Sequence, residues 1–212
     1  MEYYDLRREY DHPPLLRENL NDSPFTQFTN WFEDVKNAKI LEPNAMSLAT
    51  ATQDGKPSCR MVLMKHFDTQ GVTFFTNYNS KKAQVLNENP FASIVFFWRE
   101  LDRQVIIEGS VTKVDRKTSE KYFAARPRDS QLGTWASHHQ SQPIPSHKIL
   151  EDEYKTLKER FKNQEIPCPP FWGGFLIIPT YFEFWQGRAN RLHDRYCYQL
   201  NNGQWSIEQL AP

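Results

Sequence analysis

The chain is poor in glycine, and none of its glycines belongs to a phosphate-binding loop. Only eight glycines occur in 212 residues, and they form neither a G-x-G-x-x-G motif nor a P-loop. Any phosphate that this protein binds must therefore be held by side chains, chiefly arginine, lysine and hydroxyl groups. The G-x-S-x-G turn that carries the nucleophile of α/β-hydrolases is also missing.

Cysteines and long apolar segments are scarce as well. Cys59, Cys168 and Cys197 are odd in number, far apart and never in a C-x-x-C pair, which argues against a disulfide framework and a zinc ribbon. The longest apolar stretches, 94–98 and 171–179, are much shorter than the roughly 20 residues of a membrane helix. The N-terminus lacks the apolar core of a signal peptide. We expect a cytoplasmic protein with no membrane partner.

The chain also has no net charge, because 26 Lys and Arg balance 26 Asp and Glu. This excludes a global attraction to nucleic acid. The 15 Phe, 9 Tyr and 6 Trp favour a globular protein whose core is rich in aromatic side chains. No repeat or separate linker divides the sequence. We expect an extended, acidic N-terminal arm over 1–22 and a single domain over 23–212.

Strand patterns joined by hairpin turns dominate the sequence. Strands are expected at 45–52, 57–65, 71–76, 91–98, 103–114, 175–187, 193–200 and 204–210. Helices are expected at 24–39, at 81–89 with Ser80 as its cap, and at 116–126, 129–137 and 148–163. Because helices are inserted between hairpins rather than alternating with strands, the fold class is α+β with a mainly antiparallel barrel.

Basic residues gather at the ends of several predicted elements. The clusters are Arg60 with Lys65, Lys81 with Lys82, and Arg126 with Arg128. Since side chains alternate along a strand, Arg60 and Lys65 should leave their strand in opposite directions and serve two different anions. Such pairs are more often solvated surface charges. The strand around Arg60 is otherwise apolar, however, which favours an anion site there.

The segment 182–195 combines aromatic and basic residues. Two aromatics and a turn at Gly187 precede Arg191, His193 and Arg195, which alternation would place on one face of the next strand. Such a stripe suits a flat, anionic ligand, although an exposed charged strand is an equally good interpretation. Two neighbouring arginines should lower the pKa of His193 and keep it neutral near pH 7.

The remaining histidines do not predict a metal site. His138, His139 and His147 lie in a segment with two prolines and have no carboxylate or cysteine at the usual ligand spacing. We therefore expect no metal. The sequence also shows no local signature of a Ser/His/Asp or Cys/His nucleophile.

Motifs of a known family follow one another along nearly the whole chain. They are RREY (7–10), RMVLMK (60–65), FFTNYNSKKA (74–83), FFW (96–98), RQVIIEG (103–109), KYFAARPRDSQLGTWAS (121–137), IPCP and WGG (166–174), FWQGRANRLHDR (184–195) and the terminal LAP. In this order they resemble the pyridoxine/pyridoxamine 5'-phosphate oxidases, FMN enzymes that make pyridoxal 5'-phosphate.

The resemblance implies an FMN-binding split β-barrel with peripheral helices, assembled as a homodimer with both active sites at the subunit interface. Arg60 and Lys82 would take the FMN phosphate, and Gln104 would hydrogen-bond the flavin ring. The complete set of matching FMN positions is Arg60, Met61, Val62, Leu63, Met64, Lys65, Phe75, Thr76, Lys81, Lys82, Gln104, Gln140, Ser141, Trp185 and Arg195.

The resemblance also implies a substrate site. Lys65, Tyr122, Arg126 and Ser130 would surround the substrate's 5'-phosphate, and Arg191, Leu192 and His193 would lie beside its pyridine ring, with Arg191 and His193 as catalytic residues. The matching N-terminal residues Arg7, Arg8, Glu9 and Tyr10 contact substrate in the family. We therefore expect the arm to fold over the site as a lid that excludes water.

The implied reaction is oxidation of pyridoxine 5'-phosphate or pyridoxamine 5'-phosphate by hydride transfer from C4' to flavin N5, with O2 reduced to H2O2.

The sequence departs from the commonest family pattern at Phe75 and Lys81, where Tyr and Arg are expected, and this removes a hydroxyl and a guanidinium fork. The alternative is a non-catalytic flavin-binding split-barrel protein. Retention of the substrate positions argues against it.

Overall fold

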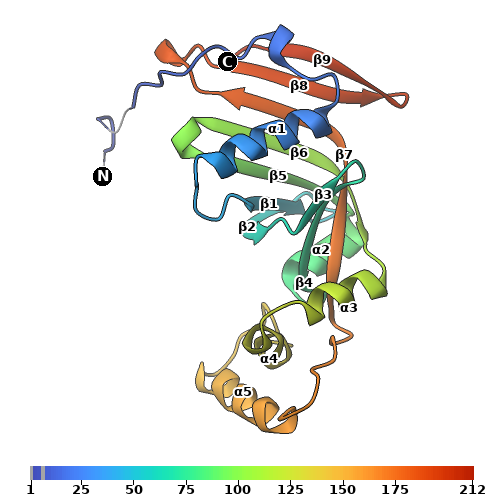
Figure 1. Ribbon diagram of the computed structural model, residues 1–212. Coiled ribbons are helices and arrows are strands. Elements are labelled where there is room, and N and C mark those ends of the chain that lie inside the picture. Colours follow the sequence, from blue (N-terminus) through green and yellow to red (C-terminus); the bar gives the residue numbers. More distant parts are fainter. Residues whose placement is uncertain (1, 6–7) are drawn as a thin grey trace.

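The computed structural model describes residues 2–5 and 8–212 (Figure 1). Its strands are β1 (Ala45–Ala51), β2 (Pro57–Leu63), β3 (His66–Asp68), β4 (Gly71–Asn77), β5 (Phe91–Trp98), β6 (Arg103–Lys113), β7 (Trp172–Gln186), β8 (Asp194–Asn201) and β9 (Gln204–Leu210). Its α-helices are α1 (Pro24–Asn37), α2 (Lys81–Glu88), α3 (Arg116–Ala124), α4 (Arg128–Ala136) and α5 (Lys148–Arg160). Single 3-10 turns are η1 (Arg17–Asn19), η2 (Arg99–Leu101) and η3 (Ala189–Arg191).

In the described part of the chain the strands form one antiparallel sheet in the order β2-β1-β5-β6-β7-β4-β3, with β8 and β9 branching from β7. The long strand β7 pairs with β4 through its first half and with β8 through its second half. The sheet divides at β7, where this change of partner occurs, and among the described strands β2, β3 and β9 are edge strands. This arrangement confirms the expected α+β antiparallel split barrel.

A bulge lies at the middle of β7. The register with β6 shifts between Glu108 and Gly109, so that Thr180 has no partner beside Pro179. Proline cannot donate a ladder hydrogen bond, and a bulge is one of the places where a sheet accepts it. The bulge therefore lets one strand continue through a proline and bend.

Helix α1 covers the inner face of the sheet. Ser23 caps it by accepting a hydrogen bond from the Thr26 amide, and Pro24 occupies the first helical position. The predicted apolar positions Phe28, Trp31 and Val35 are buried in a core cluster with side chains from β1, β5, β6 and β7. The aromatic-rich composition thus supplies the barrel core.

A second, smaller core joins α3, α4, α5 and the start of β7 at the lower end of the molecule (Figure 1). Its buried members include Phe123, Leu132, Leu157 and Trp172. Phe75 of β4 and Tyr122 of α3 pack against this cluster. The helical region is therefore attached to the barrel through aromatic side chains.

The boundaries differ from the expectation in places. The strand predicted at 57–65 ends at Leu63, and the short strand β3 was not expected. Ser80 precedes α2 but makes no side-chain cap; instead the Lys82 ammonium donates to its hydroxyl at 3.4 Å. The half-buried Lys82 therefore binds the serine that the sequence pattern predicts as the helix cap.

Within the residues that the structure describes, no helix has the length and apolar character needed to cross a membrane.

Candidate active site

A cavity of about 500 Å³ lies along the free edge of β2, between this strand, β4 and the helices α2, α3 and α4. Its described lining residues are Arg60, Met61, Val62, Leu63, Lys65, Phe75, Thr76, Lys82, Tyr122, Arg126, Pro127, Ser130, Gln140 and Trp172. Twelve of these 14 residues are positions singled out from the sequence. The fold therefore collects in one place residues that are far apart in the chain.

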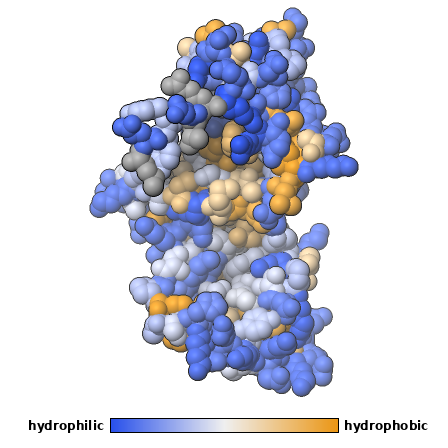
Figure 2. Space-filling view, turned by 90° about the vertical axis from the view of Figure 1, so that its left-hand side faces the viewer, coloured by the Kyte–Doolittle hydropathy of each residue, from blue (hydrophilic) through white to orange (hydrophobic). Residues whose placement is uncertain are grey.

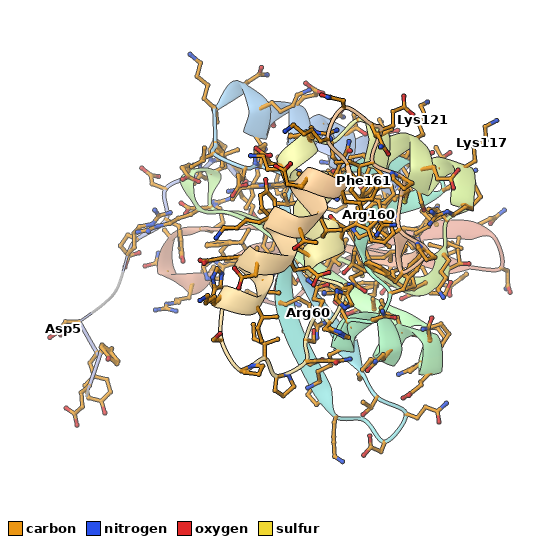
Figure 3. The ribbon with its side chains drawn as sticks, turned by 90° about the horizontal axis from the view of Figure 1, so that it is seen from below. Asp5, Arg60, Lys117, Lys121, Arg160 and Phe161 are labelled. Atoms are coloured by element: carbon orange, nitrogen blue, oxygen red, sulfur yellow. The ribbon has the colours of Figure 1, made fainter. Side chains whose placement is uncertain are left out.

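The cavity is strongly cationic. Arg60, Lys65, Lys82 and Arg126 line it, and none of the described lining residues is acidic. Seen from below, Arg60 lies near the middle of the molecule, whereas Lys117 and Lys121 of α3 extend from its rim (Figure 3). Cations that gather without acidic partners repel one another, so this arrangement is typical of an anion-binding site.

Hydrogen bonds fix two of these cations. The Arg60 guanidinium donates to the Leu48 carbonyl at 3.0 Å, the Thr50 hydroxyl at 2.9 Å and the Ser58 hydroxyl at 2.5 Å. The Lys82 ammonium donates to the Thr76 hydroxyl at 3.1 Å. These partners are neutral, and they leave both positive charges uncompensated.

Burial lowers the pKa of both groups, and the charge of Arg60 lowers the pKa of Lys82 further. Bound phosphate would oppose both effects, because a nearby anion favours the protonated forms.

Stacked aromatic rings form one wall of the cavity. The ring centroids of Phe75 and Tyr122 are 4.2 Å apart, and those of Phe75 and Trp172 are 5.3 Å apart. A Cβ on Gly174 would approach the Phe75 ring to 2.9 Å, so glycine is needed for this packing. Arg126 lies over Trp172, with 4.9 Å between its guanidinium carbon and the ring centroid.

Arg60 and Lys65 do not open into separate cavities, although strand alternation predicts opposite directions for them; that they serve two different anions stays a prediction. Both side chains line the same cavity. Lys65 lies beyond the end of β2 at Leu63, and the cavity runs along the open edge of that strand, so alternation no longer separates the two cations.

Six predicted FMN positions do not line the described cavity. Three of them lie close in the chain to lining residues: Met64 is a buried core residue, while Lys81 and Ser141 are exposed next to Lys82 and Gln140. Conversely, Pro127 and Trp172 line the cavity, although no role was predicted for either residue. The WGG motif was a signal for Trp172, because adjacent glycines indicate close packing around an aromatic residue.

The other predicted cofactor positions form a row on the outer face of the sheet. Gln104 of β6 lies opposite Trp185 of β7, which lies opposite Arg195 of β8. Cross-strand partners share a face. Phe97 of β5 extends the row, with 55% of its side chain exposed.

This row is distant from the cavity within one chain. Phe75, in the cavity wall, pairs with Gly174 near the start of β7, whereas Trp185 lies near its end. The positions 174 and 185 differ by 11 residues, which corresponds to about 36 Å measured along the strand, and none of Gln104, Trp185 and Arg195 is among the described lining residues of the cavity. One chain therefore carries two separate groups of the predicted cofactor residues.

Arg191 and His193 lie close to the row but not on a strand. β8 begins at Asp194, Arg191 belongs to η3 with φ 64°, and His193 lies in the following loop. The prediction that both share a strand face with Arg195 is therefore wrong. The loop brings His193 onto Trp185, with 4.7 Å between ring centroids.

The surroundings of His193 determine its tautomer and its protonation state. Its Nδ1 accepts a hydrogen bond from the Arg188 amide at 3.1 Å, so the neutral ring carries its proton on Nε2. Burial lowers the pKa of His193 most, the charge of Arg191 adds to the decrease, and Asp194 opposes it. The direction agrees with the sequence prediction, but desolvation, rather than charge, is the main cause.

The N-terminal arm lies against this group. The Tyr10 ring contacts Trp185 and His193 edge-on, with centroid distances of 5.8 Å and 5.4 Å. Arg8 and Glu9 are exposed, and Leu192 is 68% exposed. Arg7, also predicted to contact substrate, lies outside the described residues.

Apolar side chains are exposed on the outer face of the sheet and around the cavity. Met61 of β2 is 66% exposed and Phe91 of β5 is 61% exposed. Figure 2 shows apolar residues gathered across the middle of one face of the molecule, with hydrophilic residues above and below. An exposed patch of this kind is typical of an interaction surface.

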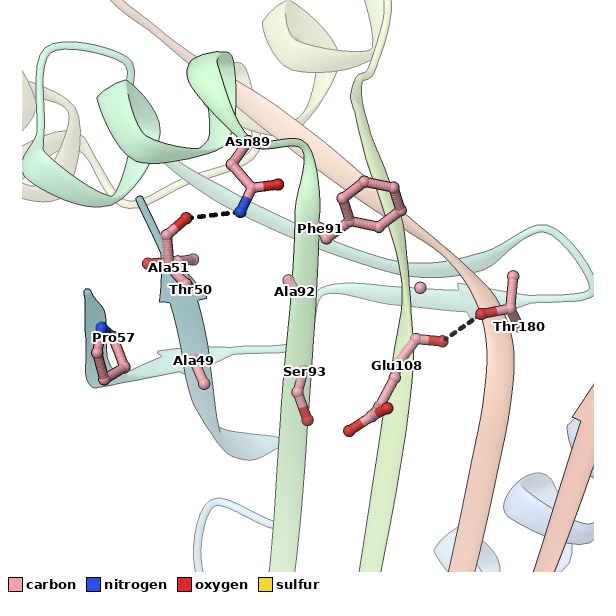
Figure 4. Close-up of a pocket in the computed structure, with 11 residues that line it drawn as sticks. Ala49, Thr50, Ala51, Pro57, Asn89, Phe91, Ala92, Ser93, Glu108 and Thr180 are labelled. Atoms are coloured by element: carbon pink, nitrogen blue, oxygen red, sulfur yellow. Dashed lines mark hydrogen bonds between the residues drawn. The ribbon is translucent and has the colours of Figure 1, made fainter. Parts of the chain in front are cut away.

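A second hollow, of about 380 Å³, lies on the outer sheet face between β1, β5 and β6 (Figure 4). Small side chains such as Ala49, Ala92 and Ser93 line it. Glu108 is the only charged residue among its described lining residues. It therefore does not suit a phosphate, and it contains none of the predicted site residues.

The family model described as pyridoxamine 5'-phosphate oxidase matches residues 32–161, and the model described as pyridoxine 5'-phosphate oxidase C-terminal dimerisation region matches residues 172–212.

Curated relatives named pyridoxine/pyridoxamine 5'-phosphate oxidase match the full length. The protein of Crocosphaera subtropica is 52% identical, with all of both chains covered. That of a Cyanothece species is 49% identical over 98% of this chain and 97% of the relative.

Two solved structures are similar as well. PhzG from Burkholderia lata, in complex with tetrahydrophenazine-1-carboxylic acid, has a TM-score of 0.90 at 29% identity, covering 97% of this chain and 100% of that one. A pyridoxamine 5'-phosphate oxidase-related, FMN binding protein from Nostoc punctiforme has a TM-score of 0.71 at 18% identity, covering 91% and 100%. The second likeness shows the split-barrel fold. With these matches along its whole length, the chain belongs to the pyridoxine/pyridoxamine 5'-phosphate oxidase family of oxidoreductases.

Proposed function

We propose that this protein oxidises pyridoxine 5'-phosphate or pyridoxamine 5'-phosphate to pyridoxal 5'-phosphate with FMN as cofactor and O2 as electron acceptor. The alcohol and O2 give the aldehyde and H2O2; the amine, O2 and water give the aldehyde, ammonia and H2O2. The observation that carries the proposal is the cavity with four cations and no acidic residue among its described lining residues. Two phosphates, one from cofactor and one from substrate, match this excess of charge.

The donor set of the cavity fits FMN. Arg60, Lys82 and Thr76 line one cavity and offer a guanidinium, an ammonium and a hydroxyl, with Lys82 hydrogen-bonded to Thr76 and close enough to Arg60 for its charge to act on Lys82. Such a set of side chains can hold a phosphate in a protein without a glycine loop. Lys65, Tyr122, Arg126 and Ser130 line the same cavity and remain for the substrate phosphate. Bound FMN would supply the hydride acceptor and the reaction with oxygen.

His193 and Arg191 are assigned to the reacting end of the substrate. Since Nδ1 of His193 accepts the Arg188 amide, the neutral ring presents Nε2–H as a donor. This proton would hydrogen-bond the substituent on C4' and hold it in the reacting orientation. Arg191 would fix the pyridine ring. The role of His193 is therefore orientation, with its lowered pKa keeping the ring neutral.

A homodimer would join the two groups of cofactor residues. The cavity and the row of Gln104, Trp185 and Arg195 lie apart in one chain. One FMN could therefore contact both groups of residues only if they came from two copies of the chain. The matched dimerisation region, 172–212, includes Trp185 and Arg195. The outer sheet face carries exposed apolar side chains, such as Phe97, that a second copy would cover. In a two-fold dimer, each cavity receives the row of the partner.

The test is to purify the protein, reconstitute it with FMN, and measure peroxide and pyridoxal 5'-phosphate from each substrate. A yellow protein that produces both supports the proposal. Protein that FMN cannot reconstitute contradicts the cofactor assignment. A yellow protein inactive with both phosphates would favour a non-catalytic flavin-binding member or a different substrate.

A further inference from the structure

Asp102 has a buried carboxylate in the turn between β5 and β6. The residue is 4% exposed and has a left-handed backbone, with φ 48°. Its carbonyl accepts hydrogen bonds from the Gly187 amide at 2.8 Å and from the Gln186 side chain at 3.2 Å. The turn is therefore fixed to the end of β7, next to the His193 loop.

Both ion-pair partners of this carboxylate come from the N-terminal arm. Arg8 pairs with Asp102, and Nε2 of His12 lies 3.0 Å from its Oδ2. Within the described residues, Arg8 is the only permanently charged partner of Asp102, and His12 pairs with it as a cation only when its ring is protonated. A carboxylate at this depth needs such partners, because burial of an unpaired charge is costly.

The arm is held on both sides of Tyr10. Toward the N-terminus, Arg8 also donates to the Arg99 carbonyl at 3.1 Å. Toward the C-terminus, the Leu15 amide donates to Oδ2 of Asp194 at 2.9 Å. Tyr10 lies between these anchors and contacts His193.

Gly187 provides the space in which the arm and the turn meet. A Cβ at this position would lie 3.0 Å from the Tyr10 ring and 3.0 Å from Cβ of Asp102. Both approaches are tighter than ordinary van der Waals contact. The absence of a side chain at Gly187 therefore leaves room for both Tyr10 and Asp102 against this residue.

We propose that Asp102 is a positioning residue, which binds Arg8 and His12 of the arm and thereby holds Tyr10 against His193. Asp102 itself does not contact substrate; it acts through the arm. Loss of the ion pairs frees the segment 8–12 and uncovers His193. The effect on catalysis rests on the proposed function of His193, whereas the docking of the arm can be measured without any substrate.

The variants are Asp102→Asn, His12→Gln and the combination of both in the full-length chain. Asparagine preserves shape and tolerates the left-handed backbone, so Asp102→Asn removes mainly the charge. His12→Gln alters an exposed segment and tests the same contact if the turn variant does not fold. The matched control is Asp22→Asn, which removes a carboxylate that is 92% exposed and pairs with Arg17.

Hydrogen exchange of the amides of residues 8–12 and of Leu15 is the primary readout, since Pro13 and Pro14 carry no amide hydrogen. Asp102→Asn should accelerate their exchange about tenfold, as expected when a buried ion pair loses one partner. The double variant should be no faster than Asp102→Asn alone, because His12 would act through the same carboxylate. Asp22→Asn should leave these amides unchanged. Unchanged exchange in Asp102→Asn, or equal acceleration throughout the barrel, overturns the proposal.

Two further readouts separate positioning from general stability. Freeing Tyr10 re-solvates His193, so its pKa, followed by NMR of the ring protons, should rise toward the ordinary value in Asp102→Asn. With pyridoxine 5'-phosphate, KM should rise about tenfold while FMN affinity stays within about twofold. If the arm is released but the pKa of His193 and KM both stay unchanged, the positioning role is overturned. If wild type oxidises neither phosphate, the proposed function fails while the exchange result still decides on the arm.

Discussion

Arg195 and Glu183 form a two-bond ion pair across neighbouring strands. The Arg195 Nε lies 2.8 Å from Oε1 of Glu183, and a terminal guanidinium nitrogen lies 3.0 Å from Oε2. Glu183 is 4% exposed and also accepts a hydrogen bond from the Tyr181 hydroxyl at 3.0 Å. The remaining guanidinium nitrogen donates to the Ala211 carbonyl at 2.8 Å, so the C-terminal residues help to orient Arg195.

Glu183→Gln should therefore weaken FMN binding although Glu183 lies outside the cavity. The amide keeps the shape but loses the charge-assisted pair, and Arg195 becomes free to adopt other rotamers. We expect a loss of FMN affinity of about tenfold, or about 1.4 kcal/mol. The measurement is quenching of flavin fluorescence on titration. Glu159→Gln, at an exposed pair with Lys162, is the control, and equal affinities of both variants would contradict the prediction.

Arg60→Ala and Arg126→Ala should separate the two phosphate sites. Arg60→Ala removes three hydrogen bonds and a charge beside Lys82, and we expect FMN affinity to fall about 10- to 100-fold. Arg126→Ala should instead raise KM for pyridoxine 5'-phosphate with FMN affinity nearly unchanged. Spectral titration and initial rates give the two quantities. Lys56→Ala, an exposed cation in the neighbouring turn, should change neither; equal effects of both cavity variants on both quantities would refute the division.

Mixing two impaired variants, at an FMN concentration that loads the wild type but not Arg60→Ala, should restore activity if each site is shared between subunits. Arg60→Ala damages the cavity of its own chain, whereas His193→Ala damages the group that its chain would supply to the cavity of the other subunit. Random exchange of subunits gives half heterodimers, and each of these has one intact site, so about a quarter of the wild-type activity should return. The measurement is peroxide formation after co-refolding or co-expression. Activity no higher than that of the separate variants would show that each site belongs to one chain.

The pH dependence should report the neutral state of His193. Its pKa lies below the ordinary value of 6.5 because of burial and the charge of Arg191. The neutral ring is present above this pKa, and protonation below it places an N–H on Nδ1 against the Arg188 amide. We expect kcat/KM to fall on the acid side, below about pH 6.5.

The titration of His193 should also lower the stability of the folded chain at acid pH. Its pKa is lower in the folded chain, so the unfolded chain binds more protons in the acid range. The stabilising contribution is therefore present above the unfolded value and is lost as the pH falls through the folded pKa. Arg191→Gln should raise the pKa of His193, as followed by NMR without substrate. Lys155→Gln, on the exposed side of α5, should not; an unchanged pKa in Arg191→Gln would contradict the assignment.

Much of the fold follows from local patterns. The turn at Asn201-Asn202-Gly203 and the alternation around it predict the hairpin of β8 and β9, and Ser23-Pro24 predicts the start of α1. Local patterns failed where tertiary contacts compete with them. Ser80 bonds Lys82 instead of capping α2, and the loop of Arg191 and His193 replaces the start of an expected strand.

The importance of Glu183 and Asp102 was also missed. Glu183 lies within an otherwise apolar strand and Asp102 in a turn, and nothing in the sequence around either residue identifies its partner. Their partners, Arg195 and Arg8, are 12 and 94 positions away in the chain. Only the paired strands and the docked arm bring these charges together.

The scarcity of glycine by itself determined that phosphate must be held by side chains, and the ordered motifs determined the family. The tertiary structure decided which cations share a cavity and which lie elsewhere. Strand alternation predicted that Arg60 and Lys65 point apart, but the open edge of β2 lets both reach one cavity. The bent strand β7 meanwhile separates that cavity from Trp185 and Arg195. Periodicity describes directions along one strand, whereas the shape of a site depends on which edges and chain segments the whole sheet brings together.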